Sequence, residues 1–393
     1  MYSNFSEKVV KIMVEESLEN NNSQKMFENL CNDNCHYELI KILLSSGKVD
    51  VTAQNNNAIR LASENGYDKV VKLLLIDGKV DVAAQDNYAI RSASENGHDK
   101  VVELLLTDGK VDVAAQDNYA IRFASENGHD KVVKLLLTDG KVDVAVQDNQ
   151  PIRFASHNGH DKVVKLLLED GKVDVTARIN YAIRFASDNG HDKVVKLLLA
   201  DGKVDVTVQD NQAIRYASQN GHDKVVELLL VDGKVDVAAQ DNYAIRFASQ
   251  NGHDKVVELL LADGKVDVAA RDNSAIRFAS ENGRDKVVDI LLKSGKINLS
   301  NITDKSILML VKKYNKVTVV KITNMMRKSG IVKICIENEG KYSITKKITG
   351  IENENENENI SQIVKMIEMR NIKSIDIEND ILVRYSSDKW QWD

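Results

Sequence analysis

Six histidines recur at one fixed spacing along this chain, and histidine is the side chain most suited to metal binding and proton transfer near neutral pH. Neighbours in the row are 31 residues apart, and each follows a glycine and precedes an aspartate. Zinc needs its nitrogen ligands at about 2.1 Å, whereas packed helices lie about 8–10 Å apart. Neighbouring histidines therefore cannot share a metal ion, and we expect each to start a helix and hydrogen-bond the adjoining loop. The row comprises His98, His129, His160, His191, His222 and His253.

Arginines form a second row with the same spacing, and such a row could bind phosphate or an acidic peptide. An aspartate stands five residues before most of these arginines, so pairing of guanidinium with carboxylate inside the protein is the simpler interpretation. Ile179 takes the place of that aspartate before Arg184, so we expect Arg184 to be less well paired. The row comprises Arg60, Arg91, Arg122, Arg153, Arg184, Arg215, Arg246 and Arg277.

Other residue patterns that carry chemistry are missing from the sequence. Cys31, Cys35 and Cys335 are too few and too scattered for a disulfide framework, which indicates reduced thiols in a cytosolic setting. Cys31 and Cys35 could form half of a zinc site, but no second ligand pair follows at zinc spacing. There is no His-Glu-x-x-His and no glycine-rich phosphate loop after a strand. We expect no enzyme activity, no catalytic residue, no metal site and no cofactor.

The elements that position these rows come from one block that repeats every 31 residues. In one copy, Asp117 or Asn118 is placed to cap a first helix over residues 119–126. A second helix is expected over 130–138, and residues 141–144 alternate polar and apolar as a short finger would. Each helix has an apolar side, but one unit cannot bury both helices alone, whereas stacked copies can. The apolar sides consist of Ala120, Ile121 and Ala124 in the first helix and Val132, Val133, Leu136 and Leu137 in the second.

This block resembles the repeat of the ankyrin family, a unit of about 33 residues with a Thr-Pro-Leu-His-x-Ala-Ala stretch, then Gly-His, then a Val-Val-x-Leu-Leu-Leu helix. Residues 119–125 replace the first stretch, while Gly128-His129 and residues 132–137 match closely. The unit is two residues shorter, so its finger should be blunter. The amino-acid sequence of the units also resembles the ankyrin families of giant DNA viruses of amoebae. The resemblance implies an all-α repeat solenoid of stacked helix-turn-helix units.

The resemblance further implies a non-enzymatic protein-interaction scaffold that binds a partner on a concave face made by the fingers and the exposed side of the first helices. The positions just before the first helix vary most between units, and tyrosine there is favoured at interfaces. The competing interpretation is that each tyrosine merely covers a neighbouring helix. The predicted partner-binding residues are Tyr88, Tyr119, Gln147, Gln150, Tyr181, Gln212 and Tyr243.

Length, charge and hydrophobicity bear on the domain organisation, the class of partner and the location of the protein. A chain of 393 residues is too long for one ordinary core, and its net charge of −6 gives no basic stripe for nucleic acid. The sequence contains no run of about 18 apolar residues, which a membrane-spanning helix would need. The N-terminus lacks the apolar core of a secretion signal. We expect a cytoplasmic monomer, in the host cytoplasm if the protein is viral.

The organisation along the chain has three parts. Residues 1–23 are expected to form a helical leader or cap, and residues 24–330 an array of eight clear units with a degenerate unit at each end. Residues 331–393 read as a small α+β segment, with a hairpin, a helix over 360–370 and a second strand pair. This segment either caps the last unit or forms a separate effector domain. A structural spacer array with no specific ligand remains the alternative to a scaffold.

Overall fold

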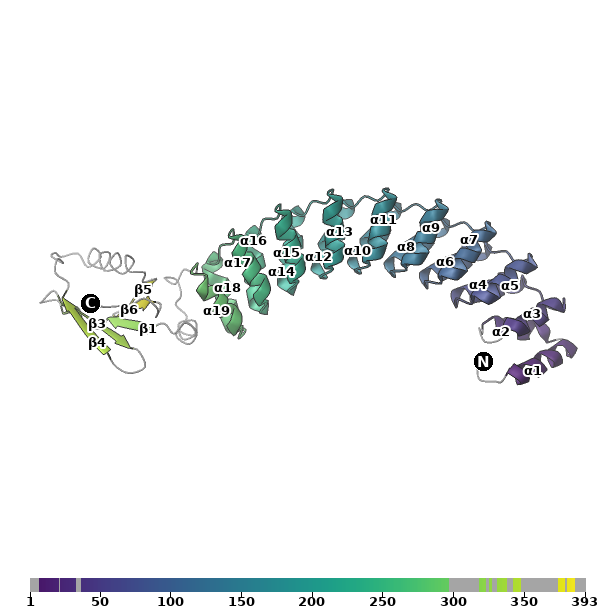
Figure 1. The fold of residues 1–393 in the computed structure, drawn as a ribbon, viewed down its shortest axis with the longest axis horizontal. Coiled ribbons are helices and arrows are strands. Elements are labelled where there is room, and N and C mark those ends of the chain that lie inside the picture. Colours follow the sequence, from purple (N-terminus) through teal and green to yellow (C-terminus); the bar gives the residue numbers. More distant parts are fainter. Residues whose placement is uncertain are drawn as a thin grey trace. The chain divides into compact units, whose positions relative to one another are not determined.

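The computed structural model describes residues 7–20, 22–32 and 37–296, together with the backbone of six strands between residues 318 and 385 (Figure 1). The chain divides into two compact parts. The first comprises residues 1–213 with 231–234, and the second comprises residues 214–230 with 235–393.

The predicted two-helix unit is confirmed along the described array. A glycine with positive φ separates the two helices of each unit, as Gly128 does with a φ of 78°. The first helices are α4 (Ala53–Glu64), α6 (Ala84–Glu95), α8 (Ala115–Glu126), α10 (Val146–His157), α12 (Ala177–Asp188), α14 (Val208–Asn220), α16 (Ala239–Asn251) and α18 (Ala270–Glu281). The second helices are α5 (Asp68–Asp77), α7 (Asp99–Asp108), α9 (Asp130–Asp139), α11 (Asp161–Asp170), α13 (Asp192–Asp201), α15 (Asp223–Asp232), α17 (Asp254–Asp263) and α19 (Asp285–Lys293).

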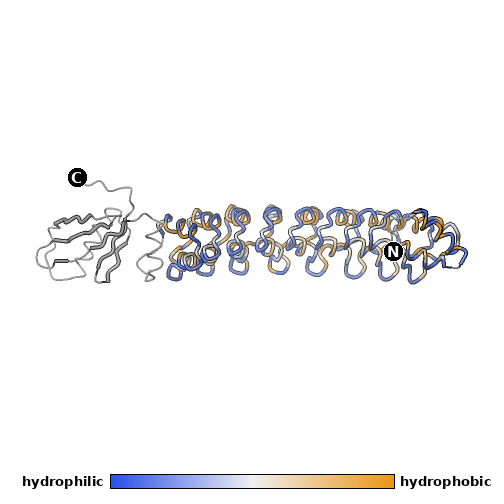
Figure 2. Tube along the Cα trace, turned by 90° about the horizontal axis from the view of Figure 1, so that it is seen from below, coloured by the Kyte–Doolittle hydropathy of each residue, from blue (hydrophilic) through white to orange (hydrophobic). Residues whose placement is uncertain are grey.

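Stacking of like helices buries the apolar sides. In the first compact part, α6 packs on α4 and α8, and α9 packs on α7 and α11. Ala120, Ile121 and Ala124 are buried together with Val132, Val133 and Leu136, as predicted, whereas Leu137 is only half-buried. In the finger, Val142 and Val144 point inward and Asp143 is exposed. Figure 2 shows hydrophobic stretches recurring unit by unit along the helices, with hydrophilic loops between them.

The first turn of each first helix contains three consecutive non-glycine residues in the left-handed conformation. Gln116, Asp117 and Asn118 have φ of 54–56°, so the regular helix begins at Tyr119. A left-handed residue costs about 1–2 kcal/mol unless it is glycine, and asparagine and aspartate tolerate it best. The prediction that Asp117 or Asn118 caps its own helix is wrong. The Asn118 side chain instead accepts a hydrogen bond of 2.7 Å from the backbone N–H of Asp143, in the finger that ends the same unit, and this contact fixes the finger.

The N-terminal residues add three helices, α1 (Glu7–Glu19), α2 (Ser23–Cys31) and α3 (Tyr37–Ser45). α2 packs on α4 and α3 packs on α5, so this pair occupies the place of a further unit, and α1 packs against both α2 and α3. α1 lies within the segment predicted as a helical leader. Cys31 is a buried free thiol, while Cys35 lies outside the described residues.

The C-terminal strands form one antiparallel sheet. β3 pairs with β1, β2 and β4, β1 also pairs with β6, and β6 pairs with β5. β1 and β2 fall inside the stretch assigned from the spacing to a degenerate last unit. The predicted helix over 360–370 lies outside the described residues, and the cap role and the boundary at 330 stay predictions. The strands are β1 (Thr318–Ile322), β2 (Met325–Met326), β3 (Ile331–Glu337), β4 (Tyr342–Lys347), β5 (Ser374–Glu378) and β6 (Asp380–Tyr385).

Candidate protein-binding surface

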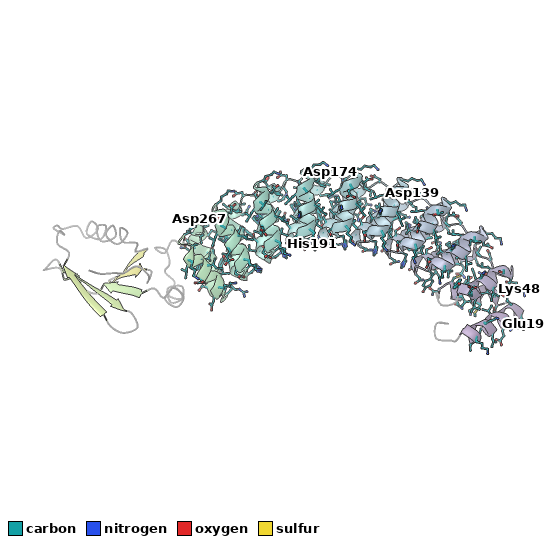
Figure 3. All side chains as sticks on the ribbon, in the orientation of Figure 1. Glu19, Lys48, Asp139, Asp174, His191 and Asp267 are labelled. Atoms are coloured by element: carbon teal, nitrogen blue, oxygen red, sulfur yellow. The ribbon has the colours of Figure 1, made fainter. Side chains whose placement is uncertain are left out.

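The histidine row fastens each unit to the one before it. The Nε2 atom of His129 lies 2.9 Å from the backbone oxygen of Glu95, at the end of the preceding first helix. Because a carbonyl oxygen only accepts, Nε2 must carry the hydrogen. The same contact, at 2.9 Å, joins four further histidines to the residue 34 positions earlier (Figure 3 labels one of them, His191, at the opposite end of the helices from Asp174). They are His98, His160, His191 and His253.

An asparagine two residues before each of these histidines donates to the same carbonyl oxygen. Asn127 Nδ2 lies 2.9 Å from Glu95 O, beside His129. The last carbonyls of a helix have no partner within it, so the next unit satisfies them with two donors. The sequence interpretation singled out the histidines but missed these asparagines, although their identical recurrence at Asn-Gly-His was the available signal.

His253 makes one of these contacts sensitive to pH. Burial lowers the pKa of His253 below its usual 6.5, and the nearby charges of His222 and Arg284 act in the same direction, whereas the hydrogen bond to Gln219 raises it. The unfolded chain therefore binds a proton more readily than the folded one. Stability is present above the unfolded-state pKa and is lost as the pH falls below about 6.5.

We expect the free energy of unfolding to fall between pH 7.5 and pH 5.0, and part of that fall to disappear in a His253→Gln variant. Urea denaturation of both proteins at both pH values measures the difference. The contributions of carboxylates that lie away from His253 are common to the two proteins and cancel in the difference. An identical pH dependence in the variant and the parent would contradict the assignment to His253.

The arginine row is also internal, but its partners differ from those predicted. Arg122 Nε donates to the backbone oxygen of Asp117 at 2.8 Å, and its Nη2 donates to that of Gln116 at 3.2 Å. The guanidinium thus holds the left-handed turn through its carbonyls, not through the aspartate carboxylate. The expectation that Arg184 is less well paired is therefore wrong. Its Nε donates at 2.7 Å to the carbonyl of Ile179. A carbonyl is present whatever the side chain.

The predicted tyrosines lie half-buried against the preceding unit. The hydroxyl of Tyr119 donates to Glu95 at 2.7 Å, and its ring lies 5.1 Å from the Arg91 guanidinium carbon. Tyr88 makes the same two contacts, with Glu64 and Arg60. Tyr243 makes them with Gln219 and Arg215.

All three predicted glutamines reach the same arginine row by a hydrogen bond, and Gln147 accepts from Arg122 at 3.2 Å. Gln150 accepts from Arg122 at 2.9 Å, and Gln212 accepts from Arg184 at 2.6 Å. Tyrosine and glutamine are therefore two ways of coupling a unit to the arginine before it. The variable row joins units, and its half-exposed side chains are held in fixed positions.

The exposed edge beside this row is formed by the left-handed turns. Gln116 donates to the Asp86 carboxylate at 3.0 Å, Gln147 donates to Asp117 at 3.5 Å, and Arg178 pairs with Asp148 at 2.6 Å. The finger lysines pair with the aspartate two residues earlier at 3.3–3.7 Å, so this edge carries charges of both signs.

Within the described residues, no three histidine, cysteine or carboxylate side chains are grouped so as to hold a metal ion. None of the helices in that part of the chain is both long and apolar enough to cross a membrane.

Comparison with known proteins agrees with the repeat geometry. A family model of ankyrin repeats in three copies matches residues 90–179, 155–241 and 214–301, and a model of the single ankyrin repeat matches residues 54–87. No curated protein matches the chain. The matched residues cover more than half of the sequence, and the chain therefore belongs to the ankyrin repeat family.

Proposed function

We propose that the array is a protein-interaction scaffold whose partner binds along the left-handed turns and the exposed side of the first helices. Ankyrin repeats generally mediate protein–protein interaction. The observation that carries the proposal is the row of half-exposed tyrosine and arginine side chains described above. Each tyrosine is held by the preceding unit, and each arginine is held by the carbonyls of its own left-handed turn. Tyrosine and arginine are the residues that dominate binding energy at interfaces, and side chains already fixed lose little entropy on binding.

The concave placement of this surface, the monomeric state, the cytoplasmic location and the relation to viral ankyrin families stay predictions from the sequence. We assign no catalytic role to the array. The alternative, a spacer with no specific ligand, has one specific observation in its favour. The near-identical units present nearly identical surfaces, so most positions along the array offer a partner little to distinguish them.

A displayed library of random peptides, selected on the full chain, separates scaffold from spacer. We expect defined peptides to be enriched, and the double variant Tyr119→Ala with Tyr181→Ala to bind them at least tenfold more weakly. Lys134→Ala, an exposed change on the second helix α9, is the matched control and should bind normally. Circular dichroism establishes that the variants are folded. If no peptide is enriched, or if the folded tyrosine variant binds as well as the parent, the scaffold proposal is wrong.

A further inference from the structure

One junction between neighbouring units has an isoleucine and a histidine at places where no other unit has them, beside an arginine that recurs only at Arg271. It lies between α10 and α12, within the first compact part, where the common Gln-Asp of the left-handed turn is replaced by Arg178-Ile179. On the facing helix, His157 replaces the glutamate or glutamine that binds the tyrosine hydroxyl elsewhere. All three departures fall on the surface proposed above to bind a partner.

Ile179 is an exposed apolar residue in a backbone conformation that opposes it. Its φ and ψ are 58° and 55°, and 55% of it is exposed. A β-branched residue is a clear outlier in the left-handed region, where the other units place aspartate or asparagine. Because Ile179 is exposed, little packing within the chain offsets the strain. An unfavourable conformation kept at a surface position points to use by something outside the chain.

The charge of this junction is reversed as well. Exchanging Gln-Asp for Arg-Ile adds one positive charge and removes one negative charge. Arg178 pairs with Asp148 at 2.6 Å, and that aspartate is the nearest compensating charge. Arg153 contacts the same residue through its backbone carbonyl, so the two cations lie beside one another. Burial lowers the pKa of Arg153, and the charge of Arg178 lowers it further.

Arg153 has a hydrogen-bonding nitrogen to spare. Its Nε and Nη2 donate to the carbonyls of Asp148 and Gln147 at 2.7 and 3.0 Å. Nη1 has no hydrogen bond among the described residues, whereas the Nη1 atoms of Arg122 and Arg184 donate to glutamine. A carboxylate brought to this junction would relieve the repulsion and take up the spare donor.

The aromatic side chains here also carry unused polar atoms. The Tyr181 and Phe185 rings are stacked with centroids 4.1 Å apart, and the His157 ring lies 6.2 and 5.6 Å from them. Within the described part of the chain, Tyr181 lacks the carboxylate or amide acceptor that its counterparts have. His157 Nδ1 is buried without a hydrogen-bond partner there. The junction therefore offers an aromatic surface with a free hydroxyl.

The corresponding residues of another junction show that these positions share one hollow. Between α4 and α6, an open hollow of about 560 Å³ is lined by both left-handed turns, together with Tyr88 and Arg91. The equivalents of Gln85, Asp86 and Tyr88 are Arg178, Ile179 and Tyr181. The positions of Arg178, Ile179 and Tyr181 therefore border one small area.

We propose that the α10–α12 junction is the main anchor of the partner, and that the partner presents an apolar side chain next to an aspartate or glutamate. This inference rests on the proposed scaffold function and refines it. Ile179 and the Tyr181–Phe185 stack contact the apolar group, and Arg153 and Arg178 bind the carboxylate. The other junctions contribute the repeated, weaker contacts on either side.

The test restores the common turn with the double variant Arg178→Gln and Ile179→Asp. Peptides enriched on the full wild-type chain from a random displayed library should combine a large apolar residue with a neighbouring acidic one. Their affinity for the variant should fall at least tenfold, while its melting temperature rises because the strained isoleucine is gone. If these two residues served only the fold, replacing them would not raise the melting temperature and lower the affinity for peptide at the same time. The reciprocal change, Gln116→Arg with Asp117→Ile, should create a second site and raise the stoichiometry of peptide binding.

The other outcomes overturn the inference. If the peptides are basic or lack an acidic residue, the assigned partner chemistry is wrong. If apolar-acidic peptides bind the variant as tightly as the parent, the anchor lies elsewhere and the scaffold function stands. If the wild-type chain enriches no peptide, both the anchor and the scaffold function fail.

Discussion

Replacing Gly128 with alanine is expected to lower the free energy of unfolding by about 2–5 kcal/mol. A Cβ at this position would lie 2.5 Å from Nδ1 and 2.7 Å from Cε1 of His160 in the next unit. That ring cannot swing aside freely, because its Nε2 is bonded to the carbonyl of Glu126 at 2.9 Å. The substitution also places a side chain at a φ of 78°, which disfavours every residue except glycine. Urea denaturation measures the loss.

Gly140 provides the matched control for this prediction. It has the same φ of 78°, but a Cβ there would meet nothing within 4 Å. Gly140→Ala should therefore show the backbone effect alone, about 1–2 kcal/mol. The difference between the two variants isolates the contact with His160. Equal losses at the two glycines would show that the close approach of the next unit has no energetic weight.

The features of the fold that the sequence could predict are those whose cause is local. Gly128 at the end of a helix and the inward valines of the finger each depend on residues within a few positions of one another, and the 31-residue spacing is the repetition of such local signals. A left-handed glycine or a two-residue alternation leaves a direct mark in the sequence. These predictions are confirmed in α8, α9 and the finger that follows.

The predictions that were wrong depend on backbone atoms, which are the same in every residue and leave no mark in the sequence. Asn118 was expected to cap its own helix, but its partner is a backbone N–H 25 residues later. Arg122 was expected to bind a carboxylate, but it binds carbonyls of the left-handed turn. Every residue has a carbonyl, so spacing cannot show which one is used. The error at Arg184 has the same origin, since losing a carboxylate at position 179 takes nothing from it.

The candidate surface was located by variation between units, and that signal had two possible meanings. Tyr119 and Gln150 vary because either residue can reach the arginine of the preceding unit. That role became apparent only when the distances between units were known. Ile179, by contrast, was noted for the missing aspartate, while its strain and exposure depend on the backbone conformation. Sequence alone could therefore mark the right face but could not rank the positions on it.

Replacing the buried serine of each unit with alanine is expected to stabilise the array, with Ser125→Ala raising the free energy of unfolding by about 1–3 kcal/mol. Ser125 is 0% exposed, and its hydroxyl has no hydrogen bond among the described residues. A buried hydroxyl without a partner loses its hydration and gains nothing in return. Alanine is also the better helix former. The same unpaired hydroxyl recurs at Ser63, Ser94, Ser156, Ser187, Ser218 and Ser249.

Ser280 separates the effect of the buried hydroxyl from that of helix propensity, because it occupies the same place in its unit but is only half-buried. Ser280→Ala should gain the helix propensity alone, so urea denaturation of the two variants gives the penalty of the buried hydroxyl by difference. Sites in successive units share no partner, and their effects should nearly add. The variant with alanine at all seven serines should therefore be far more stable than any single one. A loss of stability in Ser125→Ala would mean instead that a buried water satisfies the hydroxyl, and that the row of serines is a row of hydration sites.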